Sequence, residues 1–302
     1  MSALRTSALL IASAAVALPA LAQSGLRYTV SVTEFENRAG WHGQWDLGDA
    51  WGVVMTDKLQ QSGKFIVLGE GDMRGAALAE QDLGASGRTA QGAKTPVTGQ
   101  LTPAQILVKG AVTHVQGSTE GGGGGIRIRG LKLGGKKGKA EMNATIYMVD
   151  STTGQILAST SVVGAAKRKG AGVSYSGSNF GTGFNAYQND NVGRAMEDAI
   201  DQAVVWLAEQ IDDVPWTGSV AMVRDGQVYI NRGERDGVSA GQTFVVGSAD
   251  IIRDPDTGEV LDTFVNELAR LEATTVREKL TICNVVSGSA GAVEKGMTVQ
   301  LP

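Results

Sequence analysis

The chain has 302 residues, enough for one large domain or two of ordinary size. Its formal net charge of −4, from 27 basic and 31 acidic residues, provides no overall attraction to nucleic acid. The single cysteine, Cys283, excludes an internal disulfide; it lies in an apolar stretch, so we expect a small buried hydrophobic side chain there.

The first 22 residues have the pattern of a cleavable signal peptide. Arg5 precedes the apolar run 8–18, and small residues at Ala20 and Ala22 precede the expected cleavage before Gln23. The apolar run is shorter than the roughly 20 residues that a membrane-spanning helix needs, which favours removal over anchoring. No cysteine lies near the cleavage point, so we expect no lipid anchor and place the mature chain in the bacterial envelope.

Hydrophobic periodicity over residues 28–115 predicts an α/β layer. We expect strands at 28–35, 64–68 and 106–115, and helices from Leu47 to Gly63 and over 71–81. A polar and aromatic loop, 36–45, follows the first strand. Thr102-Pro103-Ala104 has the pattern of a helix start.

Two glycine-rich stretches, 117–139 and 167–187, flank strands expected at 140–149 and 155–163. Both alternate apolar with other residues, and their basic runs lack the interleaved aromatics of a nucleic-acid site. They are either solvated loops or membrane hairpins with alternating lipid-facing and lumen-facing side chains. In the hairpin interpretation, the apolar residues facing lipid are Ile126, Ile128, Leu131, Leu133, Val173, Tyr175, Phe180 and Phe184.

The last part of the chain begins with the strongest predicted helix, 194–211, which carries one apolar stripe. Pro215 marks a boundary, and 216–302 reads as short strands and turns, a small barrel or sandwich. The pattern Asp-x-x-Thr-Gly-x-x-Leu occurs at 150–157 and 254–261, and its Asp and Gly predict two hairpin turns.

We therefore predict an α+β chain with three parts. They are a signal peptide, 1–22, an α/β domain with two glycine-rich β-hairpin inserts, 23–215, and a small all-β domain, 216–302.

No motif predicts catalysis. His42 and His114 are isolated in sequence, and no Gly-x-Ser-x-Gly motif supplies a nucleophile. The stretch 130–137 nearly matches a phosphate-binding loop, but Lys137 occupies the position that a hydroxyl residue should fill. Asp254, in its turn, lacks the full ligand series of a calcium loop. We assign no enzyme activity, no metal and no cofactor.

Five segments between residues 28 and 212 occur in an informative order. They are the strand ending Val-Thr-Glu-Phe-Glu-Asn37, the helix 46–61, the join 62–68, and the segments 107–113 and 147–157. Together they resemble the CsgG family of curli production and transport components. Residues 228–233, 237–241 and 254–259 look like the end domain of the flagellar assembly protein FlgT.

The resemblance implies a fold and a site. In that family a periplasmic α/β domain forms a ring, two hairpins per subunit join a shared outer-membrane barrel, and a loop near the start narrows the channel. By that resemblance, loop 37–45 is the constriction, lined by Trp41, His42, Gln44 and Trp45. The chain departs from the family in lacking a lipid-anchored cysteine, in its lysine-rich first insert and in its separate carboxy-terminal domain.

Two functions from different classes remain open. The first is a homo-oligomeric outer-membrane channel that exports curli-like fibre or adhesin subunits with accessory envelope proteins. The second is a soluble periplasmic scaffold of an envelope or flagellar assembly, without a pore, in which the inserts are flexible loops. Neither function uses nucleic acid.

Overall fold

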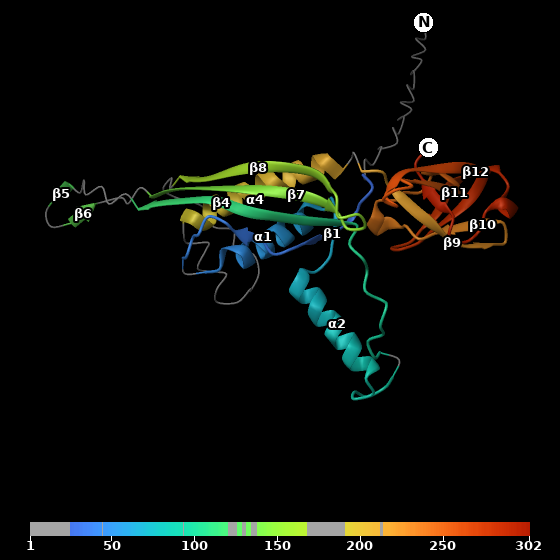
Figure 1. The fold of residues 1–302 in the computed structure, drawn as a ribbon, viewed down its shortest axis with the longest axis horizontal. Coiled ribbons are helices and arrows are strands. Elements are labelled where there is room, and N and C mark those ends of the chain that lie inside the picture. Colours follow the sequence, from blue (N-terminus) through green and yellow to red (C-terminus); the bar gives the residue numbers. More distant parts are fainter. Residues whose placement is uncertain are drawn as a thin grey trace, which may run out of the picture.

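The computed structural model describes residues 25–43, 45–92, 94–119, 126–128, 131–133, 138–167, 191–211 and 214–302. The expected signal peptide, Gln44, Val173, Tyr175, Phe180 and Phe184 lie outside the described residues. The described chain forms a mixed α/β layer followed by a closed six-stranded barrel (Figure 1).

The first sheet has the strand order β3-β1-β4-β7-β8, so that β3 and β8 form its opposite edges. β1 pairs in parallel with β3 and β4, whereas β4, β7 and β8 form an antiparallel meander. A short strand, β2, extends the pairing along β4. The bounds are β1 Thr29–Val32, β2 Glu36–Asn37, β3 Ile66–Val67, β4 Ile106–Thr119, β7 Gly138–Asp150 and β8 Ile156–Lys167.

Two helices pack side by side on one face of this sheet (Figure 1). α1 (Leu47–Ser62) begins at the N-cap Asp46 and ends at Gly63, whose φ of 63° few other residues adopt. α4 (Asn191–Gln210) covers β7 and β8. Alternate residues of β7 face these helices and are buried, as the period of two in a strand predicts. They are Met142, Ala144, Ile146 and Met148.

The helix α2 (Gly71–Ala85) has a different environment. It follows the edge strand β3 and projects from the body of the molecule (Figure 1), and Gly84 is its one buried residue. The return segment 86–102 lies along it, with the Gln91 amide donating to the Gly84 carbonyl at 3.0 Å and Arg74 donating to the Thr102 carbonyl at 3.0 Å.

The carboxy-terminal barrel closes in the order β10-β13-β12-β11-β14-β9. Its interior contains Phe244, Leu271 and Cys283, all fully buried. Beyond Gly247, β11 and β12 pair with each other alone, and this part of the hairpin extends from the barrel. The bounds are β9 Thr217–Arg224, β10 Gln227–Ile230, β11 Thr243–Arg253, β12 Val260–Val276, β13 Thr281–Gly288 and β14 Thr298–Gln300.

Both predicted Asp-Gly turns form. The Asp150 carboxylate accepts from the backbone N–H groups of Thr152 and Thr153 at 2.7 and 2.8 Å, and Gly154 has a φ of 75°. The Asp254 carboxylate does the same for Asp256 and Thr257 at 2.7 and 2.9 Å. These backbone hydrogen bonds hold the pKa of the Asp254 carboxyl below its usual value.

The helix predicted to start at Thr102-Pro103-Ala104 is wrong, because these residues lead directly into β4. The reason is pairing with β1: the Thr29 hydroxyl donates to the Pro103 carbonyl at 3.0 Å, and the Gln105 N–H donates to the Thr29 carbonyl at 2.9 Å. The first strand is also shorter than the expected 28–35. The local preference of three residues for a helix start is small compared with the hydrogen bonds of a continuous strand pairing, which override it.

Cys283 provides a test of the barrel core. Burial raises the pKa of its thiol to about 12, whereas a cysteine thiol in an unfolded chain has a pKa of about 8.5. Ionisation above that pH therefore favours the unfolded chain, and the free energy of unfolding should fall as pH rises from about 8.5 towards 12. At pH 8 the native protein should not react with an aromatic disulfide reagent until denaturant is added. Rapid native labelling would contradict the described barrel.

Candidate functional site

The loop that the sequence assigns as a constriction is held firmly at both ends. Before it, Phe35 is buried and stacks on Trp51 of α1, with ring centroids 5.1 Å apart and an interplanar angle of 20°. After it, the Asp46 carboxylate accepts from the Asp49 N–H at 3.0 Å and caps α1. Gly110 and Gly48 permit this packing, because a Cβ on either would lie within 2.4 Å of Phe35 atoms.

β2 fixes the start of the loop against the sheet. Glu36 and Asn37 pair in parallel with Ala111 and Val112 of β4, and the Arg38 N–H donates to the Val112 carbonyl at 2.9 Å. Side chains at this point are exposed and paired, since Arg38 donates to Glu36 at 2.7 Å. That hydrogen bond and the carboxylate charge raise the pKa of the Arg38 guanidinium.

The two predicted tryptophans come together. The rings of Trp41 and Trp45 have centroids 4.5 Å apart at an interplanar angle of 50°, and both are partly buried against the core. The Asn37 side chain makes two hydrogen bonds with the Trp41 backbone. Its amide N–H donates to the Trp41 carbonyl at 2.7 Å, and its amide oxygen accepts from the Trp41 N–H at 3.3 Å. Tilted aromatic pairs of this kind are more favourable than their buried area alone indicates.

Between the tryptophans the chain has little space for side chains. A Cβ on Gly43 would lie 1.9 Å from the Trp41 ring, so a side chain at this position would displace that ring. His42 is exposed, and Gln44 lies outside the described residues. The structure thus brings Trp41 and Trp45 together and leaves His42 facing solvent.

The sequence analysis missed the role of Asn37, whose side chain closes the loop on Trp41. The available signal was an asparagine two residues after the expected strand 28–35, a residue type that bonds nearby backbone groups.

Of the expected membrane hairpins, part of the first is described. β5 (Ile126–Ile128) and β6 (Leu131–Leu133) pair antiparallel, with Ile126 opposite Leu133 and Ile128 opposite Leu131. Because β4 continues to Thr119 and β7 begins at Gly138, the first insert is shorter than 117–139. No described helix has the length and apolar character needed to cross a bilayer.

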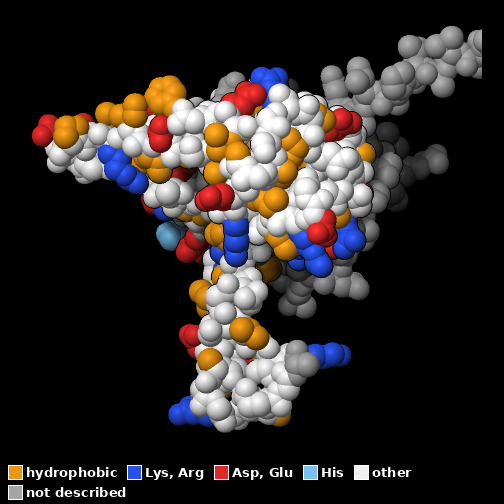
Figure 2. Space-filling model, turned by 90° about the vertical axis from the view of Figure 1, so that its right-hand side faces the viewer, with side chains coloured by type: hydrophobic (Ala, Val, Ile, Leu, Met, Phe, Trp, Pro, Cys, Tyr) orange, Lys and Arg blue, Asp and Glu red, His pale blue; other side chains and the backbone are white. Residues whose placement is uncertain are grey.

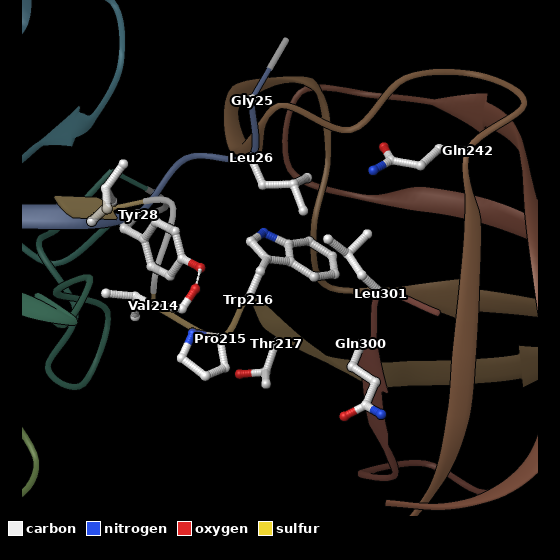
Figure 3. Close-up of a pocket in the computed structure, with 11 residues that line it drawn as sticks. Gly25, Leu26, Tyr28, Val214, Pro215, Trp216, Thr217, Gln242, Gln300 and Leu301 are labelled. Carbon is white, nitrogen blue, oxygen red and sulfur yellow. Dashed lines mark hydrogen bonds between the residues drawn. The ribbon is translucent and has the colours of Figure 1, made fainter. Parts of the chain in front are cut away.

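The junction between the sheet layer and the barrel contains a cavity of about 610 Å³ (Figure 3). Tyr28 donates from its hydroxyl to the Val214 carbonyl, and Trp216 stacks on Phe244 with centroids 5.4 Å apart. The backbone of Arg27 donates to the Asp236 carbonyl at 2.8 Å, and Gln155 donates to Glu259 at 2.6 Å. These contacts tie the barrel to the sheet, a role that residue patterns did not indicate.

The described residues contain no cluster of metal-ligating side chains. His114 is exposed on β4, and among the residues that the structure places, no three His, Cys, Asp or Glu side chains are arranged to hold a metal ion. In loop 37–45 the described residues place two tryptophan rings in contact and partly buried against the core.

No curated protein matches the sequence significantly. Among solved structures, CT253 from Chlamydia trachomatis is 12% identical, with 62% of this chain and 99% of that one covered, at a TM-score of 0.37. PelC from Paraburkholderia phytofirmans, solved as a dodecamer, is 11% identical, with 59% and 86% covered, at a TM-score of 0.31. Lipoprotein GNA1162 from Neisseria meningitidis is 15% identical, with 62% and 99% covered, at a TM-score of 0.27.

At these scores the structural likenesses carry no functional information. The family comparison is of a different kind: the model of the curli production assembly/transport component CsgG matches residues 12–241, which is most of the chain and includes the aromatic loop. The chain therefore belongs to the CsgG family.

Proposed function

We propose that this protein is an envelope assembly and export component whose subunits form a ring-shaped outer-membrane channel for surface-fibre or adhesin subunits. The observation that carries the proposal is the paired Trp41 and Trp45, held on a braced loop inside the part of the chain that matches the family. A channel throat must keep its diameter against passing polypeptide, and a pair of contacting rings on a loop that is held at both ends can do so.

The flanking features supply the remaining parts of the proposal. Loop 37–45 lines the throat, and the hairpin containing β5 and β6, with the later insert 167–187, lies in the membrane with the apolar residues named above facing lipid. Open strand edges leave backbone groups unpaired in lipid, so closure requires neighbouring subunits. Homo-oligomerisation is therefore part of the proposal, as are accessory envelope partners.

Trp41→Ala should raise single-channel conductance in a planar bilayer, and Trp45→Ala should do the same, because each removes one ring of the throat. The matched control is Trp206→Ala on α4, a partly buried tryptophan outside the loop, which should leave conductance unchanged. Purified protein that gives no conductance steps, or loop variants with wild-type conductance, would count against the channel.

The carboxy-terminal barrel favours a second candidate. A closed β domain joined near Pro215 is a separate interaction module, and its sequence resemblance to the FlgT end domain supports a soluble periplasmic scaffold of an envelope or flagellar assembly. Release by osmotic shock would favour this scaffold, whereas extraction by detergent from the outer membrane would favour the channel.

A further inference from the structure

The exposed large apolar side chains of the described chain gather mainly in two groups. The first group is on the α2 arm, which we define as α2 and its return segment 86–102: Met73, Leu78, Leu83 and Val97. The second we call the edge surface, formed by β8 and the outer part of the β11–β12 hairpin: Ile156, Leu157, Val163, Ile251, Ile252, Val260, Leu261 and Phe264. Groups of this kind mark interaction sites more often than single exposed side chains do.

Few residues of the α2 arm are buried in the described subunit. It has 15 helical residues, of which Gly84 is the buried one, and Leu78 is 48% exposed. Isolated helices of this length are marginal in water, and most helical stability in proteins comes from tertiary packing. Three glycines, Gly71, Gly75 and Gly84, lower its intrinsic propensity further. The arm therefore requires a surface outside its own subunit.

The two parts of the edge surface, although far apart in sequence, meet where the start of β8 lies against the tip of the hairpin. The Gln155 side chain, at the start of β8, donates to Glu259 at the tip of the hairpin at 2.6 Å. Leu261 and Phe264 on this hairpin are 58% and 53% exposed. Figure 2, which looks onto the barrel end, shows hydrophobic side chains exposed on the barrel side of the molecule.

Strand addition is blocked over part of this edge. Asp198 of α4 accepts from the Ala165 N–H at 2.9 Å, and Gln202 donates to the Val163 carbonyl at 2.9 Å. These bonds occupy outward-facing backbone groups of β8, a common way to protect an edge strand. A partner there is recognised by side chains.

The two groups lie on opposite sides of the molecule. α2 follows β3 at one edge of the sheet, whereas β8 is the other edge. Figure 1 shows β8 and β12 along the top and α2 projecting below.

The arm as a whole is balanced, with Asp72, Glu80 and Asp82 against Arg74, Arg88 and Lys94, but its distal end and the hairpin tip carry opposite charge. The exposed residues Arg88 and Lys94 lie at the end of the arm, where Figure 2 shows basic side chains, while the hairpin tip carries Asp256, Glu259 and Asp262. Surfaces with opposite potentials favour one docking orientation over others.

We propose that the α2 arm of one subunit packs on the edge surface of the next copy of this chain. Contacts between two different surfaces of identical subunits are heterologous, and they produce rings when the rotation closes. This inference rests on the proposed homo-oligomer and names the surfaces that build it. The apolar side chains of both groups become buried at each junction, and the helix of the arm gains the packing that it lacks.

The test uses two variants of the full chain, Leu78→Glu on the arm and Leu261→Glu on the edge surface. Analytical ultracentrifugation should show the wild type as an oligomer and each variant as a monomer, with self-association weakened roughly 100-fold or more, because each places a charge in an apolar contact. Val286→Glu, on an exposed position of β13 outside both groups, is the matched control and should assemble like the wild type. Circular dichroism should show that all three fold.

Mixing the two variants gives the decisive result. Each retains one intact surface, so a 1:1 mixture should form a dimer and stop there, since the remaining surfaces are both damaged. A twofold contact predicts no such rescue. Folded variants that assemble like the wild type, or a mixture that stays monomeric, would overturn the inference while leaving the ring and the channel in place. A wild type that is monomeric in buffer and in detergent would instead overturn both this inference and the proposed homo-oligomer.

Discussion

Replacing Trp51 by alanine should lower the free energy of unfolding by about 3–5 kcal/mol, as for other buried aromatic residues. Trp51 is fully buried and stacks on Phe35, the residue that fixes the start of loop 37–45. The cavity left by the indole would also release Phe35 from α1. A loss of this size is a large part of the roughly 5–15 kcal/mol by which domains are stable.

Trp51→Phe is the matched control, because it keeps an aromatic ring against Phe35. It also removes the indole N–H of Trp51, which has no hydrogen-bond partner in the described part of the chain, and so should cost much less than alanine. Urea unfolding followed by far-UV circular dichroism compares the three proteins. An alanine variant within 1 kcal/mol of the wild type would show that this stack does not support the loop.

Gly164→Ala should be nearly as damaging, although it adds one methyl group. Gly164 lies on the face of β8 that packs on α4, where a Cβ would be 1.8 Å from the Ala195 carbonyl oxygen and 2.6 Å from the Ala199 nitrogen. These are backbone atoms of a helix and cannot rotate away. We expect a loss of about 3 kcal/mol, the upper part of the range for overpacking.

The control for Gly164→Ala is Ser161→Ala, three residues earlier and exposed on the opposite face of β8, which should change stability by less than about 0.5 kcal/mol. Amide hydrogen exchange provides a second readout. The Ala165 N–H now donates to the Asp198 carboxylate, and displacement of α4 should break this hydrogen bond and speed the exchange of that amide. Equal stability of the two variants would mean that α4 does not pack on β8 as described.

Much of the secondary structure could be predicted from the sequence because it is encoded locally. The apolar spacing of α1 and α4, the glycine at 63 and the two Asp-Gly turns depend on residues within a few positions of one another. The burial of Cys283 followed from its apolar neighbours. The ordered series of such elements was also enough to indicate the family that the comparison then showed.

Tertiary structure decided the features that depend on distant residues. The pattern at Thr102-Pro103-Ala104 predicted a helix, but pairing with Thr29, more than 70 positions earlier, holds the segment extended into β4. Closure of the barrel joins β9 to β14, and the 4.5 Å pairing of Trp41 with Trp45 depends on β2 docking against β4. The family resemblance named these tryptophans, but their contact required the packed loop.

The same division applies to the surfaces. Sequence periodicity identified α2 as a helix, yet it could not show that the helix projects from the edge of the sheet opposite β8. Exposure is a property of the assembled layers, since a leucine is buried or exposed according to which elements pack over it. The sequence by itself determined which segments are helices, turns and buried strands, because local chemistry sets them. Only the packing of those segments decided which apolar side chains remain available to another molecule.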